Sequence, residues 1–405
     1  MAINNIDRLH IGIFGRRNTG KSSIINRLTG QNLSIVSEIP GTTTDPVKKA
    51  VEIPGLGPTI LIDTAGIDDI GELGNQRIKK TQQAVRQVDM AIVALCNNHL
   101  DKHEQQLIEQ LQQLRIPILL LHNKSDEHPA DGSFAKELIA NYQIDFLDFS
   151  AKTGDNLEEL LLLLQKNIPD NFNQLPTLFG DKVKKGDLVL LVTPIDSEAP
   201  AGRMILPQVQ AIRESLDFNC MAVIVKETEV EGFIRQTSIT PALVITDSQL
   251  FGKIDKLIPP EIPLTSFSIL LARQKGNFEA YLKGTPSIDK LLDGDRILIM
   301  ESCTHHSTCD DIGRVKIPRW LQEYTGRQLE FDVLPGLTEP PRPVNEYALV
   351  LQCGGCMITR KQLLNRIQAA IDANVPVTNY GMTIAYVKGV YKRSVELFGG
   401  SAVAS

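Results

Sequence analysis

The stretch Gly15-Arg16-Arg17-Asn18-Thr19-Gly20-Lys21-Ser22 decides the fold of the first part of the chain, because it has the complete G-x-x-x-x-G-K-S pattern of a phosphate-binding loop. Its glycines let backbone N–H groups curl around a phosphate chain, Lys21 reaches the terminal phosphates, and the Ser22 hydroxyl can ligate Mg²⁺. The apolar run 10–14 before the loop predicts a buried strand, and the segment from Ser22 onward predicts a helix whose positive N-terminus faces the anion. A Gly-rich turn without a ligand is the alternative, and the full pattern in this setting disfavours it. The residues expected to contact the nucleotide here are Gly15, Asn18, Thr19, Gly20, Lys21, Ser22 and Ser23.

Length and composition indicate a globular protein of more than one domain. The chain has 405 residues, of which 42% are hydrophobic and 22% are charged, and a single hydrophobic core rarely serves so long a chain. Its net charge of −6 gives no general attraction to nucleic acid or to an anionic membrane. No apolar run approaches the roughly 20 residues that span a bilayer, and residues 1–7 have neither the basic region nor the apolar core of a signal peptide. We therefore expect a cytoplasmic protein with neither a membrane partner nor a nucleic-acid partner.

Apolar runs alternate with amphipathic segments over about 8–168, which predicts a parallel sheet covered by helices on both faces. Proline-bearing breaks at 168–176 and 258–263 divide the remainder of the chain. We therefore predict an α/β protein in which a P-loop nucleotide-binding domain (1–170) is followed by two smaller α/β domains (178–262 and 266–405). The runs expected to form strands are 58–62, 90–95, 116–121, 187–192, 221–225, 296–300 and 347–351, and a helix is expected over 207–216.

Two segments after the loop fit the metal and γ-phosphate side of a nucleotide switch. Asp63-Thr64-Ala65-Gly66 directly follows a predicted strand, so the Asp63 carboxylate can hold Mg²⁺ through water and the Gly66 N–H can sense a γ-phosphate. The segment 41–45 offers switch threonines, of which Thr43 is the most plausible Mg²⁺ ligand. The residues expected to act in catalysis are Lys21, Thr43, Asp63 and Gly66.

Two further segments fit recognition of a guanine base. In Asn123-Lys124-Ser125-Asp126 the carboxylate of Asp126 can accept both the N1–H and the exocyclic amine of guanine, whereas adenine offers no matching pair of donors. Ser150-Ala151-Lys152 follows another strand and supplies the loop under the base. Each short motif alone is weak, but five in this order at strand ends predict GTP rather than ATP as the nucleotide.

This set of motifs resembles the translation-factor-related GTPases of the Era and TrmE type. The resemblance implies that Asn18 matches the asparagine with which potassium-activated members hold a K⁺ beside the phosphates, where the cation offsets developing negative charge. Ile67 stands where Ras-like enzymes have the glutamine that orients water. We therefore expect GTP hydrolysis that is slow and activated by K⁺.

Six cysteines fall into two classes. Cys96 and Cys220 lie in apolar surroundings and are predicted to be core residues. Cys353-Gly354-Gly355-Cys356 is a C-x-x-C turn, and Cys303-Thr304-His305 ends another predicted strand, so both follow the carboxyl ends of strands, where open α/β sheets place ligands. In a reducing compartment these thiols are more plausibly metal ligands than disulfide partners.

The spacing of these cysteines leaves the metal open. A structural zinc site using Cys303, His305, Cys353 and Cys356 has acceptable chemistry. An iron–sulfur cluster held by three thiolates and one weaker ligand is equally compatible with the sequence. A thioredoxin-like redox dithiol fits less well, because bulky residues usually separate its cysteines and because it would leave Cys303 unexplained. Core thiols without a metal are the least favoured alternative.

A GTPase domain of this type, a middle α/β domain and a last domain with Cys-x-His and Cys-x-x-Cys together resemble the HydF family, the GTPases and scaffolds that mature FeFe-hydrogenase. The resemblance implies that Cys303, Cys353 and Cys356 hold a 4Fe–4S cluster. Many members have a histidine directly before the C-x-x-C, where this chain has Gln352, so that position supplies no histidine ligand. The candidate fourth ligands are then Glu301 and His305, while Cys309 and His306 have no counterpart.

The same resemblance implies partners, and one other function competes with it. It implies a homodimer formed through the middle domain, a two-iron precursor with CO and cyanide ligands that comes from radical-SAM maturases, and apo FeFe-hydrogenase as its recipient. The rival is an RNA-associated GTPase, acting in tRNA modification or ribosome assembly, with a structural zinc module. Nearly equal numbers of basic and acidic residues after position 270 disfavour this rival.

Overall fold

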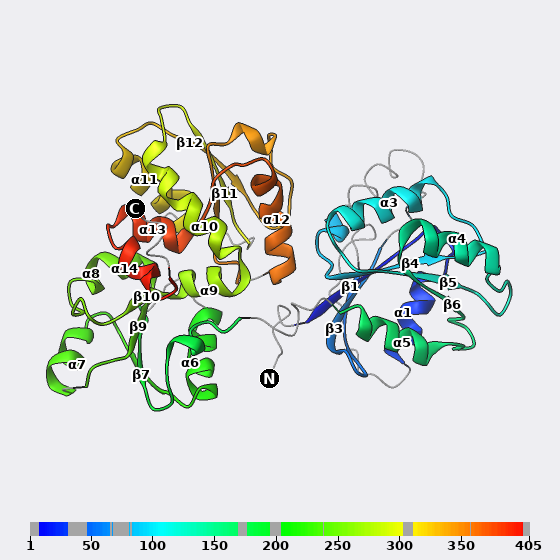
Figure 1. Cartoon of the computed structure of the whole chain (residues 1–405), viewed down its shortest axis with the longest axis horizontal. Helices are drawn as coiled ribbons and strands as arrows, with labels where there is room; N and C mark the ends of the chain where they lie inside the picture. Colours follow the sequence, from blue (N-terminus) through cyan, green and yellow to red (C-terminus); the bar gives the residue numbers. More distant parts are fainter. Residues whose placement is uncertain are drawn as a thin grey trace. The chain divides into compact units, whose positions relative to one another are not determined.

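The computed structural model divides the chain into two compact units, Met1–Gln174 and Leu175–Ser405 (Figure 1). Each unit is described by itself. The structure describes residues 8–30, 47–64, 67, 81, 83–168, 176–194, 204–237, 239–302, 311–356 and 358–399.

The first unit is a six-stranded sheet in the order β2-β3-β1-β4-β5-β6. The strands are β1 (Leu9–Phe14), β2 (Val47–Ile53), β3 (Gly57–Asp63), β4 (Met90–Leu95), β5 (Ile118–Asn123) and β6 (Asp145–Phe149). The helices are α1 (Lys21–Thr29), α3 (Lys102–Gln113), α4 (Gly132–Tyr142) and α5 (Leu157–Lys166). Strands β1, β4 and β5 are buried along their whole length, as continuous apolar runs in a covered parallel sheet require.

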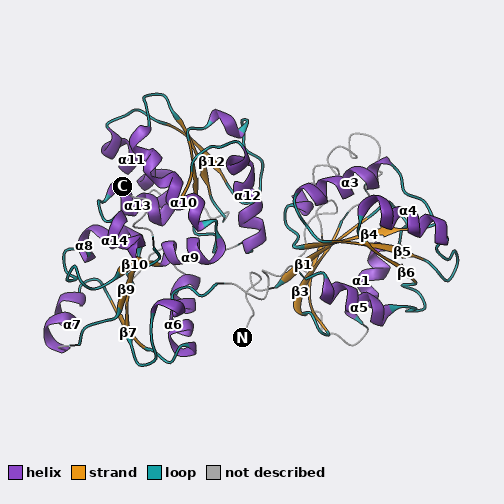
Figure 2. Cartoon of the chain, viewed as in Figure 1, coloured by secondary structure: helices purple, strands orange, loops and turns teal. Residues whose placement is uncertain are grey.

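The helices cover both faces of this sheet (Figure 2). Apolar residues of α1 and α5 pack on one face, where Ile24 and Leu160 belong to one buried cluster. Apolar residues of α3 and α4 pack on the other face, where Leu107 and Leu138 belong to a second cluster. The P-loop α/β fold predicted from the alternating apolar runs is thus confirmed.

One strand of the sheet corrects the prediction that all of its strands are parallel. Strand β2 pairs antiparallel with β3, whereas the other pairs are parallel. The two strands are joined by a tight turn in which Gly55 has a φ of +79°, and such a short connection can only reverse the chain. Because β2 is an edge strand that carries Lys48, Lys49 and Glu52, it did not stand out as an apolar run.

The second unit contains two four-stranded parallel sheets, β10-β9-β7-β8 and β12-β11-β13-β14. The strands are β7 (Leu188–Val192), β8 (Met221–Val225), β9 (Leu243–Thr246), β10 (Leu264–Ser266), β11 (Arg296–Met300), β12 (Glu330–Leu334), β13 (Leu349–Gln352) and β14 (Val377–Asn379). The helices are α6 (Leu206–Asp217), α7 (Val230–Thr237), α8 (Phe251–Ile254), α9 (Phe267–Lys275), α10 (Phe278–Gly284), α11 (Ile317–Thr325), α12 (Arg360–Asp372), α13 (Tyr380–Val387) and α14 (Tyr391–Glu396).

One buried core joins the two sheets of this unit. It contains residues of β7 and β9 together with residues of β11, β13 and β14. Helix α9 lies between the sheets in Figure 1 and contacts α6 on one side and α12 and α13 on the other. The proline-rich segment at 258–263 contributes Ile258 and Ile262 to this shared core, so the predicted boundary between the second and third domains lies within one compact unit.

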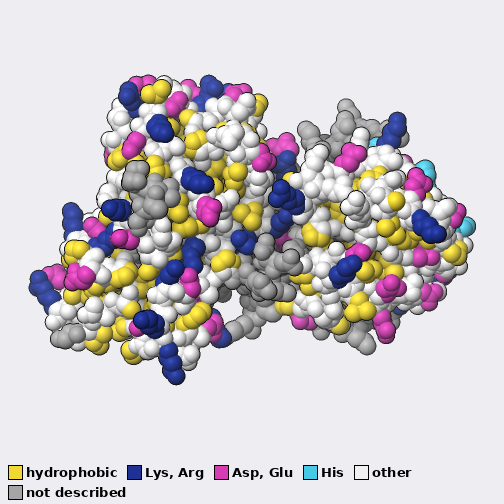
Figure 3. All heavy atoms as spheres, viewed as in Figure 1, with side chains coloured by type: hydrophobic (Ala, Val, Ile, Leu, Met, Phe, Trp, Pro, Cys, Tyr) yellow, Lys and Arg dark blue, Asp and Glu magenta, His cyan; other side chains and the backbone are white. Residues whose placement is uncertain are grey.

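No helix among the described residues is both long enough and apolar enough to cross a membrane. Acidic and basic side chains are interspersed over the face shown in Figure 3.

Candidate functional site

The phosphate-binding loop connects β1 to α1, as its sequence pattern predicts. Two of its glycines are required by geometry, because Gly15 has a φ of +144° and Gly20 a φ of +88°. A Cβ added at Gly15 would lie 2.5 Å from the carbonyl oxygen of Ala94, and one added at Gly20 would lie 2.3 Å from Nδ2 of Asn123. Neighbouring strands therefore press closely on the loop and hold its backbone in a curved conformation.

Lys21 and Ser22, the residues predicted to hold the phosphates and Mg²⁺, lie at the start of α1. The Lys21 ammonium folds back over the loop and donates to the carbonyl oxygens of Gly15 (2.8 Å) and Arg16 (2.7 Å). The Ser22 hydroxyl donates to Oδ2 of Asp63 at 3.0 Å, across 41 residues of sequence. A hydroxyl and a carboxylate at this distance are oxygen ligands of the kind that Mg²⁺ prefers. Thr43 and Gly66, the other two residues expected to act in catalysis, lie outside the described residues.

Asn123 connects two loops of the predicted nucleotide site. This buried side chain donates from Nδ2 to the carbonyl oxygen of Thr19 (2.8 Å) and accepts at Oδ1 from the N–H of Ala151 (3.0 Å). It therefore ties the phosphate-binding loop to the loop 150–152, both of which were predicted to contact the nucleotide.

Asp126, the residue predicted to recognise the base, is an ionised acceptor. Its Oδ1 accepts from the Ser150 hydroxyl at 2.7 Å, and its Oδ2 lies 3.4 Å from Nζ of Lys152. The hydrogen bond from Ser150 and the charge of Lys152 lower the pKa of the Asp126 carboxyl below its usual value. At neutral pH the group is therefore a carboxylate that can only accept hydrogen bonds.

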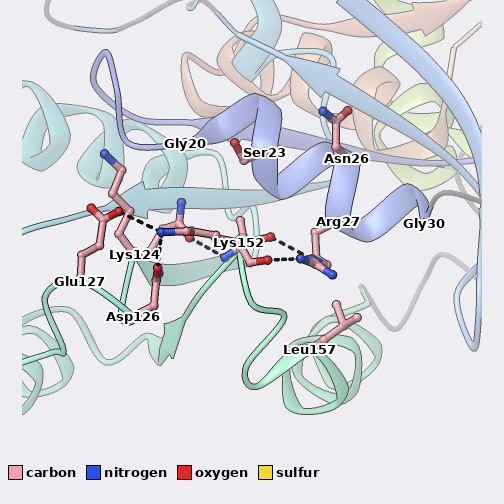
Figure 4. Close-up of a pocket in the computed structure, with 12 residues that line it drawn as sticks. Gly20, Ser23, Asn26, Arg27, Gly30, Lys124, Asp126, Glu127, Lys152 and Leu157 are labelled. Atoms are coloured by element: carbon pink, nitrogen blue, oxygen red, sulfur yellow. Dashed lines mark hydrogen bonds and ion pairs between the residues drawn. The ribbon is translucent and has the colours of Figure 1, made fainter.

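These residues surround a pocket of about 700 Å³, within the range of small-molecule sites. Figure 4 shows Asp126 and Glu127 directed toward Lys152 on one side of the pocket and Arg27 on the other side. The pocket is lined by Gly20, Ser23, Asn26, Arg27, Gly30, Asn123, Lys124, Asp126, Glu127, Ala151, Lys152 and Leu157.

Two arginines support this site, although the sequence motifs predict no role for them. Arg27 donates from Nε to the carbonyl oxygen of Ala151 (2.8 Å) and from Nη2 to that of Lys152, so it fixes the loop 150–152, which is predicted to lie under the base. Arg16 pairs through Nε with the fully buried carboxylate of Glu104 at 2.7 Å, which anchors the phosphate-binding loop to the start of α3. No sequence pattern predicts either contact, because each partner lies more than eighty residues away.

We expect Asp126→Asn to weaken GTP binding by roughly 10- to 100-fold and to improve binding of xanthosine triphosphate, because an amide reverses one donor–acceptor match with the base. Hydrolysis measured against both nucleotides checks this. The matched control is Glu127→Gln, a neighbouring carboxylate that lines the same pocket and should leave GTP preferred. Equal hydrolysis of ATP and GTP by the unmodified protein would contradict this account of the base site.

The C-x-x-C turn begins where two adjacent strands of the last sheet end. The N–H of Cys353, the residue after β13, donates at 3.0 Å to the carbonyl oxygen of Met300, the last residue of β11. Cys303 is expected to continue from the same strand, but it lies outside the described residues, as do His305, His306 and Cys309. The edge position predicted for the C-x-x-C turn is therefore observed for Cys353.

Two N–H donors and one hydroxyl lie within hydrogen-bond distance of the sulfur of Cys353. Ser302 approaches it with its N–H at 3.1 Å and its hydroxyl at 2.8 Å, and Nε2 of the fully buried Gln352 lies at 3.5 Å. Hydrogen bonds of this kind orient a sulfur that binds a metal and tune the metal bound to it. Cys356 differs, because it packs against an apolar cluster and burial raises the pKa of its thiol.

The structure holds the carboxylate of Glu301, a candidate fourth ligand, against a cation. Both oxygens of Glu301 accept from Arg314, with the shortest contact at 2.8 Å. Its role as a ligand remains a prediction. Among the described residues no group of three or more His, Cys, Asp or Glu side chains could hold a metal ion, but two of the predicted ligands lie outside those residues.

The two cysteines that the structure describes at this turn suit a soft metal site. Both are free thiols on one four-residue turn, and thiolates are the ligands of zinc and of iron–sulfur clusters. Cys96 and Cys220 are also free, and both are buried as predicted.

Comparison with known families divides the chain into three matched segments. Residues 10–124 match a model described as 50S ribosome-binding GTPase. Residues 178–276 match a model described as hydrogen maturase F dimerization domain, and residues 279–397 match one described as hydrogen maturase F tetramerization domain. The last two segments together cover more than half of the chain.

Among curated proteins, the chain is similar to GTPases over part of its length. It is 37% identical over 120 residues to the tRNA modification GTPase MnmE of Nitrosomonas europaea, which covers 29% of this chain and 26% of that protein. It is 32% identical over 183 residues to the GTPase Era of Clostridium kluyveri, which covers 43% of this chain and 61% of that protein. The chain thus spans between a quarter and three fifths of these relatives.

Among solved structures, a mutant Era of Aquifex aeolicus bound to GDP and AlF₄⁻ matches at 19% identity with a TM-score of 0.35, covering 54% of this chain and 92% of that one.

Proposed function

The chain belongs to the hydrogen maturase F family, and we propose that this hydrogenase maturation GTPase is also an iron–sulfur scaffold that delivers the two-iron subcluster of the FeFe-hydrogenase active site. The observation that carries the proposal is the C-x-x-C turn at the ends of β11 and β13, with hydrogen-bond donors around Cys353.

The protein residues that would hold a 4Fe–4S cluster are Cys353 and Cys356 on this turn, with Cys303 as the third thiolate. Three thiolates leave one iron with a weaker ligand, for which Glu301 and His305 are the candidates, and a displaceable ligand is what a carrier needs. The chain's own part is to present the thiolates at one sheet edge and to hold the sulfur of Cys353 with Ser302 and Gln352. The cargo is a two-iron unit with CO and cyanide ligands, received from radical-SAM maturases and passed to the apo-hydrogenase.

A transfer assay tests the carrier role. Full-length protein isolated anaerobically from cells that also produce the radical-SAM maturases should activate purified apo-hydrogenase, with hydrogen evolution as the readout. Protein from cells that lack those maturases should not activate it. Equal activation by both preparations, or by neither, would contradict the proposal.

The nucleotide site supports a slow GTPase. Lys21 and Ser22 are placed to hold the phosphates and Mg²⁺ against Asp63. Ile67 is buried in the apolar cluster beside α3, so at this position the chain presents no side chain that could orient a water molecule. Free cysteines fit the reducing conditions of the cytoplasm, where we place the protein.

We expect K⁺ to accelerate GTP hydrolysis clearly over Na⁺, and Asn18→Ala to remove that difference. Asn18 lies at the exposed crest of the loop with a φ of +62°, a conformation that asparagine tolerates better than most residues. We propose that its side chain lies beside the phosphates of the bound nucleotide, where a monovalent cation can offset charge that develops in the transition state. Steady-state rates in the two salts, at equal ionic strength, check this. Equal rates for the unmodified protein would contradict it.

Self-association is supported by the names of the two family domains and by the edge strand β8. This strand ends the sheet of β7 to β10, and its Met221 and Ile224 are 55% and 45% exposed. Figure 3 shows hydrophobic side chains at the surface of the part of the unit that holds this sheet. An edge strand with exposed apolar residues favours pairing with a second copy of the chain.

We therefore expect Ile224→Lys to lower the dimer fraction, because it places a charge on that edge. Light scattering of the full chain measures the mass. Leu162→Lys on α5, an apolar position in the other unit that is even more exposed, at 64%, is the control and should leave the mass unchanged. A monomeric mass for the unmodified protein would contradict the proposed dimer.

The RNA-associated alternative is favoured by a relative named for tRNA modification and by the match of residues 10–124 to a family described as ribosome-binding GTPases. Those matches reach only part of each relative, and the segment after residue 177 matches hydrogen maturase domains instead. The structure adds no broad basic surface on the face shown in Figure 3.

A further inference from the structure

A buried lysine lies directly beneath the cysteine turn. Lys275 is the last residue of α9 and is only 2% exposed. Its Nζ donates to the carbonyl oxygen of Gly355 at 3.3 Å and to that of Ile358 at 3.2 Å. The first acceptor lies between the two cysteines of the turn, and the second lies two residues after Cys356.

The rest of α9 forms the floor on which the turn sits. A Cβ added at Gly354 would lie 3.4 Å from Cδ1 of Leu271, which shows how closely the backbone of the turn approaches the helix. Cys356 packs against the apolar cluster that contains Leu270 and Leu271. The family match assigns α9 to the dimerization segment 178–276 and the turn to the tetramerization segment 279–397, so Lys275 joins the two.

Thiolates that bind a metal cluster keep their negative charge, and a cluster with three thiolates is anionic. A fixed positive charge beneath the turn favours that anion, and it favours the reduced form more than the oxidised form because reduction adds another negative charge.

We propose that Lys275 is the charge-balancing and positioning residue of the metal site: it anchors the C-x-x-C turn to α9 and stabilises the anionic, reduced state of the bound cluster. This rests on the proposed function, in which the turn holds an iron–sulfur cluster. Lys275 acts through the turn and through its charge, without being a ligand.

Two substitutions separate charge from hydrogen bonding. Lys275→Gln removes the charge and keeps an N–H donor for the turn, whereas Lys275→Met removes both and keeps the apolar stem. Lys283→Gln, at an exposed position on α10, is the matched control. Each full-length variant is reconstituted anaerobically, its fold is compared with the unmodified protein by circular dichroism, and its cluster potential is measured by EPR-monitored redox titration.

We expect Lys275→Gln and Lys275→Met to shift the cluster to a more negative potential, and Lys283→Gln to leave it unchanged. If the cluster in Lys275→Gln has the same potential as in the unmodified protein, the charge assignment is wrong. This holds even if Lys275→Met loses its cluster or fails to fold.

A Co²⁺ titration of the cluster-free protein gives a second readout that does not depend on iron and sulfide. Charge-transfer absorption reports thiolate ligation, and Lys275→Met, which removes the anchoring contacts to Gly355 and Ile358, should weaken Co²⁺ binding by roughly 10- to 100-fold, the usual effect of losing a supporting group around a metal site. Unchanged Co²⁺ affinity would overturn the proposal. If the unmodified protein forms no iron–sulfur cluster, the proposed function fails, while the Co²⁺ result still decides the role of Lys275.

Discussion

Cys353→Ala should abolish the 4Fe–4S cluster and, with it, hydrogenase maturation. Cys353 starts the turn that we propose binds the cluster, and its sulfur lies within hydrogen-bond distance of Ser302 and Gln352. Without it only two of the three predicted thiolates remain, and two thiolates do not hold a cubane cluster. Iron and sulfide content after anaerobic reconstitution, together with the EPR spectrum of the reduced protein, measure the loss.

Cys220→Ala is the matched control for that experiment. Cys220 is a free, buried thiol of the same unit, and burial raises its pKa as it does for Cys356. It packs beside β7 in the apolar cluster and should be dispensable for metal binding. A full 4Fe–4S signal in Cys353→Ala, or an equal loss of iron in Cys220→Ala, would overturn the assignment of the turn.

Lys21→Ala should reduce GTP hydrolysis by roughly 10²- to 10³-fold, the usual effect of removing one group that stabilises transition-state charge. The iron content of the reconstituted protein should stay the same. The two sites lie in separate compact units, 1–174 and 175–405, so loss of the Lys21 ammonium does not touch the packing around the cysteines. Phosphate release and iron analysis on one preparation measure both effects.

Lys136→Ala is the matched control, because it also removes a lysine from the first unit, at an exposed position on α4. It should hydrolyse GTP at the unmodified rate. Loss of the cluster in a correctly folded Lys21→Ala protein would show that the two sites depend on each other for assembly.

Sequence patterns predicted those parts of the fold that follow from local composition. Strands β4, β8 and β11 begin and end where their apolar runs do, because a continuous apolar run between polar turns leaves little choice of boundary. The phosphate-binding loop was predicted equally well, because its glycines and its Lys-Ser pair each have a defined role in binding phosphate and Mg²⁺. Strand β2 was missed because an edge strand with charged residues carries no such run.

The supporting contacts of both sites could not be predicted. Asn123 bridges two loops, which its motif does not predict. Ser302 contacts Cys353 across 51 positions of sequence, and Lys275 contacts Gly355 across 80. These pairs arise from the order of strands within each sheet and from the position of α9, which no local pattern encodes. Sequence periodicity predicts the strands and helices, whereas the contacts between them depend on the tertiary arrangement.

Metal analysis of the unmodified full-length protein, purified without oxygen, tests the central claim most directly. The account predicts a brown protein with about four iron and four sulfide per chain, and an EPR signal of a reduced 4Fe–4S cluster. Zinc without iron or sulfide would contradict it and would favour the RNA-associated GTPase with a structural zinc module.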